Sequence, residues 1–215
     1  GVEVNVLSVV NEYSVKFPEE IYQFHKSLGF EYMQFIPLVE TDPDNPEKSA
    51  AYSVGEKAYG DFLIKLFDLW QNDFEDGIAT TSIRHFDSVF HSYVGLEAPE
   101  CTLLKECGNY VVVEHNGDVY SCDFFVEPTW KLGNLYDDDI LVMLNSEKQK
   151  EFGELKSDLP EKCQKCKWQR QCYGGCTKDR LRDPEDNGLS HFCESYIAFF
   201  EHSDVRLKEL AEDWK

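Results

Sequence analysis

The sequence predicts an α/β fold in two parts: the C-terminal portion of a partial (β/α) barrel over residues 1–95, and a small α+β domain over residues 96–215. Two observations indicate the first part. Stretches rich in Val, Leu and Ile alternate with amphipathic stretches before residue 95, and no cysteine occurs among them. A third observation marks the second part, since all eight cysteines lie after residue 100, around one β-hairpin signal. Alternating strands and helices are typical of a parallel sheet covered by helices.

The first β–α unit is predicted from apolar composition and from turn residues. Residues 2–10 are rich in Val and Leu and predict a strand. Residues 18–28 predict a helix, because Pro18 fits its first turn and Gly29 follows its end. Residues 32–38 then predict the next strand.

The second and third units follow an acidic, proline-containing loop at residues 41–47. Ser53 is expected to cap a helix. Its apolar residues recur at helical spacing and are Phe62, Leu63, Leu66, Phe67 and Trp70. A third strand is predicted over residues 78–83 and a short helix over residues 86–93.

Three such units do not close a barrel. Parallel strands need covering crossover connections, and closure removes exposed sheet edges. We therefore interpret residues 1–95 as part of a larger barrel. A small, self-sufficient open sheet is the alternative that the sequence leaves open.

The second part opens with a hairpin. Residues 110–114 and 119–122 flank His115-Asn116-Gly117-Asp118, and Asn-Gly predicts a two-residue type I′ turn. The second strand ends at Cys122, with Asp123 directly after it. A further helix is expected from Ser146 through residue 155, and a last one over about residues 190–214.

The cysteines form two groups, and their spacing is the strongest functional signal. The first group is Cys101, Cys107 and Cys122; the second is Cys163, Cys166, Cys172, Cys176 and Cys193. Thiolates select zinc or iron–sulfur clusters over hard cations, and C-x2-C-x5-C-x3-C is short enough to surround one centre. A disulfide framework is disfavoured because the chain is long enough to bury a core. A pair of structural zinc sites remains open.

Composition excludes several classes of function. A formal charge of -20 argues against nucleic acid and against anionic membrane surfaces, and no apolar run reaches the length of a membrane span. With 42% hydrophobic residues the chain is expected to be globular and soluble, and reduced thiols imply the cytoplasm. The six histidines show no paired metal spacing, and no phosphate-binding loop is present.

The pattern Cys107-x9-Gly117-x4-Cys122, Cys163-x2-Cys166-x5-Cys172-x3-Cys176 and then Cys193 resembles the seven-cysteine SPASM motif of radical S-adenosylmethionine enzymes. Cys101 completes a set of eight. Shorter segments are similar to the anaerobic sulfatase-maturating enzymes; they are residues 34–37 (QFIP), 82–87 (SIRHFD), 122–125 (CDFF) and 130–134 (WKLGN).

The resemblance implies two auxiliary [4Fe-4S] clusters. Auxiliary cluster I is implied on Cys101, Cys107, Cys122 and Cys176, and auxiliary cluster II on Cys163, Cys166, Cys172 and Cys193. In the complete enzyme it further implies S-adenosylmethionine and a third [4Fe-4S] cluster. The implied partners are a sulfatase polypeptide, whose Cys or Ser side chain is oxidised to formylglycine, and an electron donor or acceptor protein.

One departure from the family pattern matters. The radical-generating C-x3-C-x2-C is missing, since no cysteine precedes Cys101. We therefore interpret the chain as the C-terminal part of a longer enzyme, which alone should not cleave S-adenosylmethionine. There are two alternatives: another SPASM maturase that acts on a different peptide, and a noncatalytic zinc module.

Asp123 matches the base proposed for the family. Burial beside an anionic, thiolate-ligated cluster would make this carboxylate a stronger base, whereas an ordinary exposed aspartate is the plain alternative. Gln34 and Val39 lie near the expected C-terminal end of a barrel strand, and Arg84 ends the next strand. These three residues are expected to line the pocket for S-adenosylmethionine or the peptide. A plain core strand over residues 34–39 and a surface salt bridge of Arg84 are the alternatives.

Overall fold

The computed structural model describes residues 2–214, and its first feature is a three-stranded parallel sheet. The strands are β1 (Asn5–Val10), β2 (Tyr32–Pro37) and β5 (Ser82–Ile83), in the order β1-β2-β5. Asn5 pairs with Tyr32 and Met33 with Ile83. The predicted parallel sheet is confirmed, although β1 begins at Asn5 rather than at residue 2.

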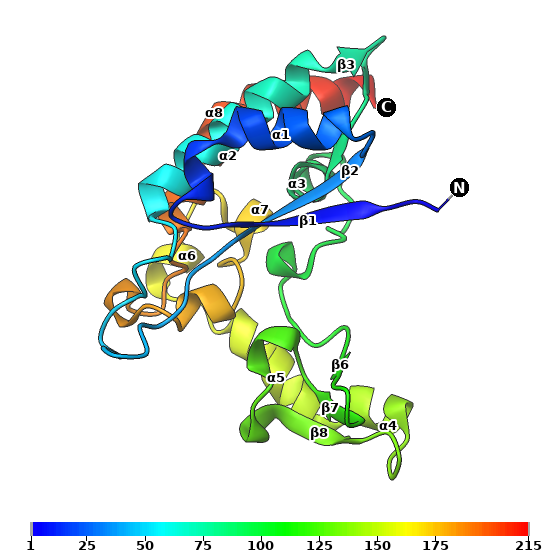
Figure 1. The fold of residues 1–215 in the computed structure, drawn as a ribbon, viewed down its shortest axis with the longest axis vertical. Coiled ribbons are helices and arrows are strands. Elements are labelled where there is room, and N and C mark those ends of the chain that lie inside the picture. The colour runs from blue at the N-terminus through cyan, green and yellow to red at the C-terminus, as the bar shows by residue number, and fades with distance from the viewer. Residues whose placement is uncertain (1, 215) are drawn as a thin grey trace.

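Helices α1 (Pro18–Ser27) and α2 (Glu56–Asn72) lie on one side of this sheet, and α3 (Arg84–Val94) follows β5 (Figure 1). Pro18 opens α1, and Gly29 has a positive φ of 81° just beyond its end, as predicted. The prediction that Ser53 caps α2 is wrong. Gly55 occupies the N-cap, and the Ser53 hydroxyl instead accepts a hydrogen bond from the Glu40 N–H at 3.1 Å.

The strand predicted over residues 78–83 is two short strands. Strand β3 (Phe74–Glu75) pairs antiparallel with β4 (Ile78–Ala79), and only Ser82 and Ile83 join the parallel sheet. Asp76 and Gly77 both have positive φ, 50° and 81°. Both central residues of a type I′ turn require this conformation, so Asp-Gly makes a tight hairpin where one strand was expected.

The main core is aromatic and joins the sheet to the last helix, α8 (Cys193–Asp213). Alternate residues of β2, Met33 and Phe35, are buried beneath the helices. Phe86 of α3 stacks on Phe199 of α8 with ring centroids 5.2 Å apart. The core also holds Tyr22, Tyr59, Phe62, Phe67, Trp70, Phe192, Tyr196 and Phe200. Helix α8 lies behind α2 in Figure 1, so the chain end packs against its first half.

A smaller antiparallel sheet lies away from the main core, at the bottom of Figure 1. It consists of β6 (Val112–Val113), β7 (Asp118–Tyr120) and β8 (Lys131–Asn134), with α4 (Ile140–Leu144) and α5 (Glu147–Ser157) beside it. Ser146 caps α5 by accepting from the Gln149 N–H at 3.2 Å, as expected for a helix that starts there.

The predicted hairpin is confirmed, but its turn is not type I′. Gly117 has a positive φ of 83° and Asn116 does not. The Gly117 N–H donates to the Glu114 carbonyl at 2.9 Å, which is a type I turn followed by a left-handed glycine. The Asn116 side chain accepts from the Asp118 N–H at 3.1 Å, a local bond that favours this longer loop.

Candidate metal and substrate site

The first group of four thiols surrounds a small cavity beside the hairpin. Cys122 follows β7, and Cys101 opens the 3-10 turn η2 (Cys101–Leu103). Cys107 lies in the loop beside α5, and Cys176 comes from the second cysteine group of the sequence. All four line the same cavity, together with Tyr110, Phe124, Phe125 and Phe152. Four soft donors around one enclosed space fit an iron–sulfur cluster.

The other four thiols surround a second cavity near the start of α8. Cys163 lies on α6 (Glu161–Gln164), Cys172 ends α7 (Gln169–Cys172), and Cys193 is the first residue of α8. Cys166 completes the set, and Trp168, Tyr196 and Phe200 form part of the wall. The Trp168 N–H donates to the Cys166 sulfur at 3.4 Å, the kind of contact that a metal-bound thiolate receives.

A sharp turn sends Cys172 and Cys176 into different cavities. Tyr173, Gly174 and Gly175 between them all have positive φ, 45°, 78° and 68°. Glycine adopts this conformation readily, whereas a side chain at Gly174 would place its Cβ 2.6 Å from the Leu159 side chain. Cys172 therefore stays with the other cysteines of the second group, whereas Cys176 joins Cys101, Cys107 and Cys122 at the first cavity.

Burial raises the pKa of Cys101, Cys122 and Cys176 in the first set and of Cys163, Cys172 and Cys193 in the second. The pKa reaches about 11 for Cys122 and Cys172 and about 12 for Cys193. That of Cys176 lies well above the ordinary value for the same reason. These six thiols are therefore protonated at neutral pH, and a metal that binds here must displace their protons.

One face of α5 organises the first cavity, and the sequence analysis missed it. Gln149 is buried and its side-chain N–H₂ donates to the carbonyls of Gly108 and Tyr110 at 3.1 and 2.9 Å. The Gly153 carbonyl accepts from the Cys107 N–H at 3.2 Å. Lys156, one turn further, is fully buried. The available signal was the spacing of Gln149, Gly153 and Lys156, which places them on one helix face.

We predict that Gly153→Ala displaces Cys107. A Cβ at this position would lie 2.7 Å from the Cys107 carbonyl oxygen. Alanine has a helix propensity about 1 kcal/mol better than that of glycine, which acts against the clash. We still expect the free energy of unfolding to fall by about 1–2 kcal/mol, and this loss must come from the clash. Urea denaturation measures it. Glu154→Ala, at an exposed position of the same helix, is the control. Equal stability of the two variants would contradict the prediction.

A larger cavity of about 460 Å³ lies between the open face of the parallel sheet and the first thiol set. Gln34 of β2, Arg84 and Asp123 line it, as do Cys101 and Cys176. Val39 departs from the expectation, because its side chain is fully buried in the main core. Strand alternation explains the position of Gln34. Its neighbours Met33 and Phe35 face the helices, so Gln34 faces the opposite side of the sheet, where the cavity lies.

Asp123 begins the 3-10 turn η3 (Asp123–Phe125) directly after Cys122. The Tyr110 hydroxyl donates to Asp123 Oδ1 at 3.0 Å and lies 3.4 Å from the Cys122 sulfur. Asp123 is exposed in this chain rather than buried, so the burial expected to strengthen it as a base is not what the structure shows. Tyr110 fixes the carboxylate at the mouth of the cavity.

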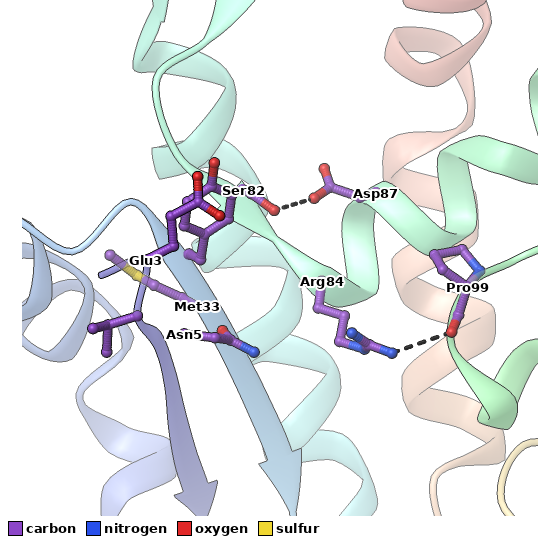
Figure 2. Close-up of a pocket in the computed structure, with 9 residues that line it drawn as sticks. Glu3, Asn5, Met33, Ser82, Arg84, Asp87 and Pro99 are labelled. Carbon is purple, nitrogen blue, oxygen red and sulfur yellow. Dashed lines mark hydrogen bonds between the residues drawn. The ribbon is translucent and has the colours of Figure 1, made fainter. Parts of the chain in front are cut away.

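Arg84 lies between this cavity and a neighbouring one of about 370 Å³ at the amino ends of the strands. Figure 2 shows this neighbouring cavity, where the Arg84 guanidinium donates to the Pro99 carbonyl at 3.1 Å. Ser82 bonds Asp87 beside it. Arg84 is the first residue of α3 rather than the last of a strand, and it is exposed.

His191 forms the third group of potential metal ligands, with Asp183 and Asp186. Its Nδ1 lies 2.9 Å from an Asp186 oxygen, and its Nε2 lies 3.1 Å from the Val54 carbonyl. Each ring nitrogen therefore lies within hydrogen-bond distance of an oxygen atom from another segment. This arrangement joins the loop before α8 to the residues before α2, and we interpret it as structural.

Comparisons with known proteins agree with this geometry. Residues 101–167 match the SPASM family, described as an iron-sulfur cluster-binding domain. The chain is 37% identical to the cysteine-type anaerobic sulfatase-maturating enzyme of Clostridium perfringens, covering all of this chain and 58% of the relative. It is 35% identical to the serine-type enzyme of Bacteroides thetaiotaomicron, covering 98% and 55%.

A solved structure described as native anSMEcpe with bound AdoMet superposes with a TM-score of 0.85 at 35% identity, covering 98% of this chain and 57% of that one. Another, with bound AdoMet and the Cp18Cys peptide, gives 0.85 at 34% identity, covering 98% and 58%.

The fold and the thiol sets define a SPASM-type iron–sulfur protein. The matches are more specific, and the chain belongs to the family of anaerobic sulfatase-maturating enzymes. It spans less than two thirds of the length of these relatives, 55% and 58%. Within residues 2–214, no helix combines the length and the apolar character needed to cross a membrane.

Proposed function

We propose that this chain is part of a radical S-adenosylmethionine maturase that oxidises a Cys or Ser side chain of a sulfatase to formylglycine. The observation that carries the proposal is the pair of cavities, each lined by four cysteines, with Asp123 beside the first. The relatives and the peptide-bound structure support the class of substrate.

Each cavity would hold one [4Fe-4S] cluster. Cys101, Cys107, Cys122 and Cys176 would bind auxiliary cluster I, and Cys163, Cys166, Cys172 and Cys193 auxiliary cluster II. Four cysteine ligands leave no open iron position, which favours electron transfer over substrate coordination. Residues 1–95 would then form the barrel portion, and residues 96–215 the domain that holds both clusters.

The oxidation removes a hydrogen atom, a proton and an electron from the substrate side chain. A Ser side chain gives the aldehyde directly, whereas a Cys side chain gives a thioaldehyde, which water hydrolyses to the aldehyde with release of hydrogen sulfide. S-adenosylmethionine and a third cluster, in the complete enzyme, would supply the radical that takes the hydrogen atom. Asp123 accepts the thiol or hydroxyl proton on a carboxylate oxygen, and the Tyr110 O–H orients this carboxylate at 3.0 Å. Cys101 and Cys176 line the same cavity, so the remaining electron has a short route to the first site.

Gln34 and Arg84 would bind the peptide or S-adenosylmethionine from the sheet side of the cavity. An electron donor or acceptor protein would complete the cycle by restoring the oxidation state of the clusters. Cysteine-type and serine-type relatives match at 37% and 35% identity, so both substrates belong in the test.

The test incubates the full-length protein anaerobically with S-adenosylmethionine, a reductant and a sulfatase-derived peptide. The peptide carries Cys, Ser or, as the control, Ala at the target position. Mass spectrometry should detect formylglycine from the Cys or Ser peptide and none from Ala. Cleavage of S-adenosylmethionine without oxidation of either peptide would point to a maturase for another peptide.

A further inference from the structure

Lys156 of α5 is fully buried between the two thiol cavities. A lysine in such a position is costly unless its charge is compensated. Burial lowers the pKa of the Lys156 amine, and the thiols of both sites act against this shift, in the order Cys107, Cys172, Cys176 and Cys101. Its location therefore differs from that of the other lysines of α5, such as the exposed Lys150, which pairs with Glu147 at 2.6 Å.

The Lys156 ammonium donates to three backbone carbonyls. The acceptors are the carbonyls of Thr102 at 3.0 Å, of Tyr173 at 3.1 Å, and of Gly175. An ammonium has three N–H donors and no acceptor, whereas a neutral amine has only two donors. Three acceptors around one nitrogen therefore match the three N–H donors of the charged form.

Each of these carbonyls belongs to a neighbour of a cysteine. Thr102 follows Cys101, and Gly175 precedes Cys176, both in the first set; Tyr173 follows Cys172, in the second set. One side chain thus bonds the backbone next to both sites. Arg180 holds the backbone of Lys156 in turn, since it donates to the Lys156 carbonyl at 3.0 Å.

We propose that Lys156 is a positioning residue shared by the two cluster sites: it fixes their spacing and supplies one buried positive charge to both clusters. The inference rests on the proposed function, because it requires a cluster in each cavity. A cluster bound by four thiolates is anionic, and reduction adds negative charge. A fixed cation beside it stabilises the reduced form and raises the reduction potential.

The test replaces Lys156 in the iron-loaded 215-residue chain. Lys156→Met keeps an unbranched side chain but removes the charge, and Lys156→Gln also keeps N–H donors. Lys150→Met, which removes a charge from the exposed side of the same helix, is the control. Midpoint potentials are measured by redox titration with electron paramagnetic resonance, and iron and sulfide are determined on every sample.

In both Lys156 variants the reduction potentials of both clusters should fall by at least about 59 mV. For a one-electron reduction this corresponds to a tenfold change in the equilibrium constant. Lys150→Met should leave them unchanged. Unchanged potentials, or a fall at one cluster alone, would overturn the shared role.

If the Lys156 variants do not retain clusters, the pattern of loss decides. Iron lost from both sites together, with Lys150→Met fully loaded, supports the role of Lys156 in fixing both sites. Iron lost from one site alone overturns it. Absence of two clusters from the unmodified chain would instead reject the proposed function.

Discussion

Replacing Asp123 by Asn in the full-length enzyme is expected to reduce formylglycine formation by about 10²-fold or more while S-adenosylmethionine cleavage continues. Asn nearly preserves the shape of Asp and can still accept the 3.0 Å hydrogen bond from Tyr110. It cannot take the proton that leaves the substrate thiol or hydroxyl. The loss therefore falls on the substrate step alone.

The measurement quantifies 5′-deoxyadenosine and formylglycine in the same anaerobic reaction. Asp137→Asn is the matched control, because it removes one carboxylate from an exposed position in the loop after β8. Full formylglycine yield from Asp123→Asn would remove Asp123 from the mechanism. Parallel loss of both products would indicate damage to the neighbouring Cys122 site or to substrate binding.

Cys176→Ala is expected to loosen both thiol sites, whereas Cys193→Ala should affect one. Cys176 lines the first cavity, and its neighbour Gly175 belongs to the turn that leads from Cys172 of the second site. The Gly175 carbonyl also accepts a hydrogen bond from Lys156, so a change at Cys176 reaches both sites. Loss of a structural metal site removes folding free energy on the order of several kcal/mol. Cys176→Ala should therefore lower hydrogen-exchange protection in the hairpin and in residues 163–175.

Cys193→Ala should act more locally. Its thiol lines the cavity of the second thiol set, and the rest of α8 stays anchored by Phe199, Phe200 and Leu207 in the main core. Only the first turn of α8 and the loop around Cys163 should lose protection. Equal and equally local changes in the two variants would contradict the crossed arrangement of the ligands.

Much of the fold follows from local sequence signals. Apolar strands and well-marked helix ends predicted the parallel pairing of β1 with β2 and the bounds of α1. The errors arose where a turn competed with a strand. Asp76-Gly77 interrupts an apolar stretch with two left-handed residues, and the Trp70 indole N–H bonds the Thr81 carbonyl at 2.8 Å where the chain bends again.

The candidate site divides in the same way. The family resemblance implied which thiols share a cavity, whereas spacing alone placed Cys176 with the second group. The supporting residues Gln149, Gly153 and Lys156 were not predicted, since their role depends on backbone carbonyls that only the fold brings near them. The exposure of Asp123 likewise depends on which segments cover the cavity, and no local pattern encodes that.

We propose that the chain holds two four-cysteine iron–sulfur sites, and the other proposals depend on them. The most direct test is iron, sulfide and zinc analysis, with Mössbauer spectroscopy, of the anaerobically reconstituted 215-residue chain. The structure predicts about eight iron and about eight sulfide ions per chain, in two all-cysteine [4Fe-4S] clusters. A colourless, folded protein with stoichiometric zinc and no sulfide would contradict it.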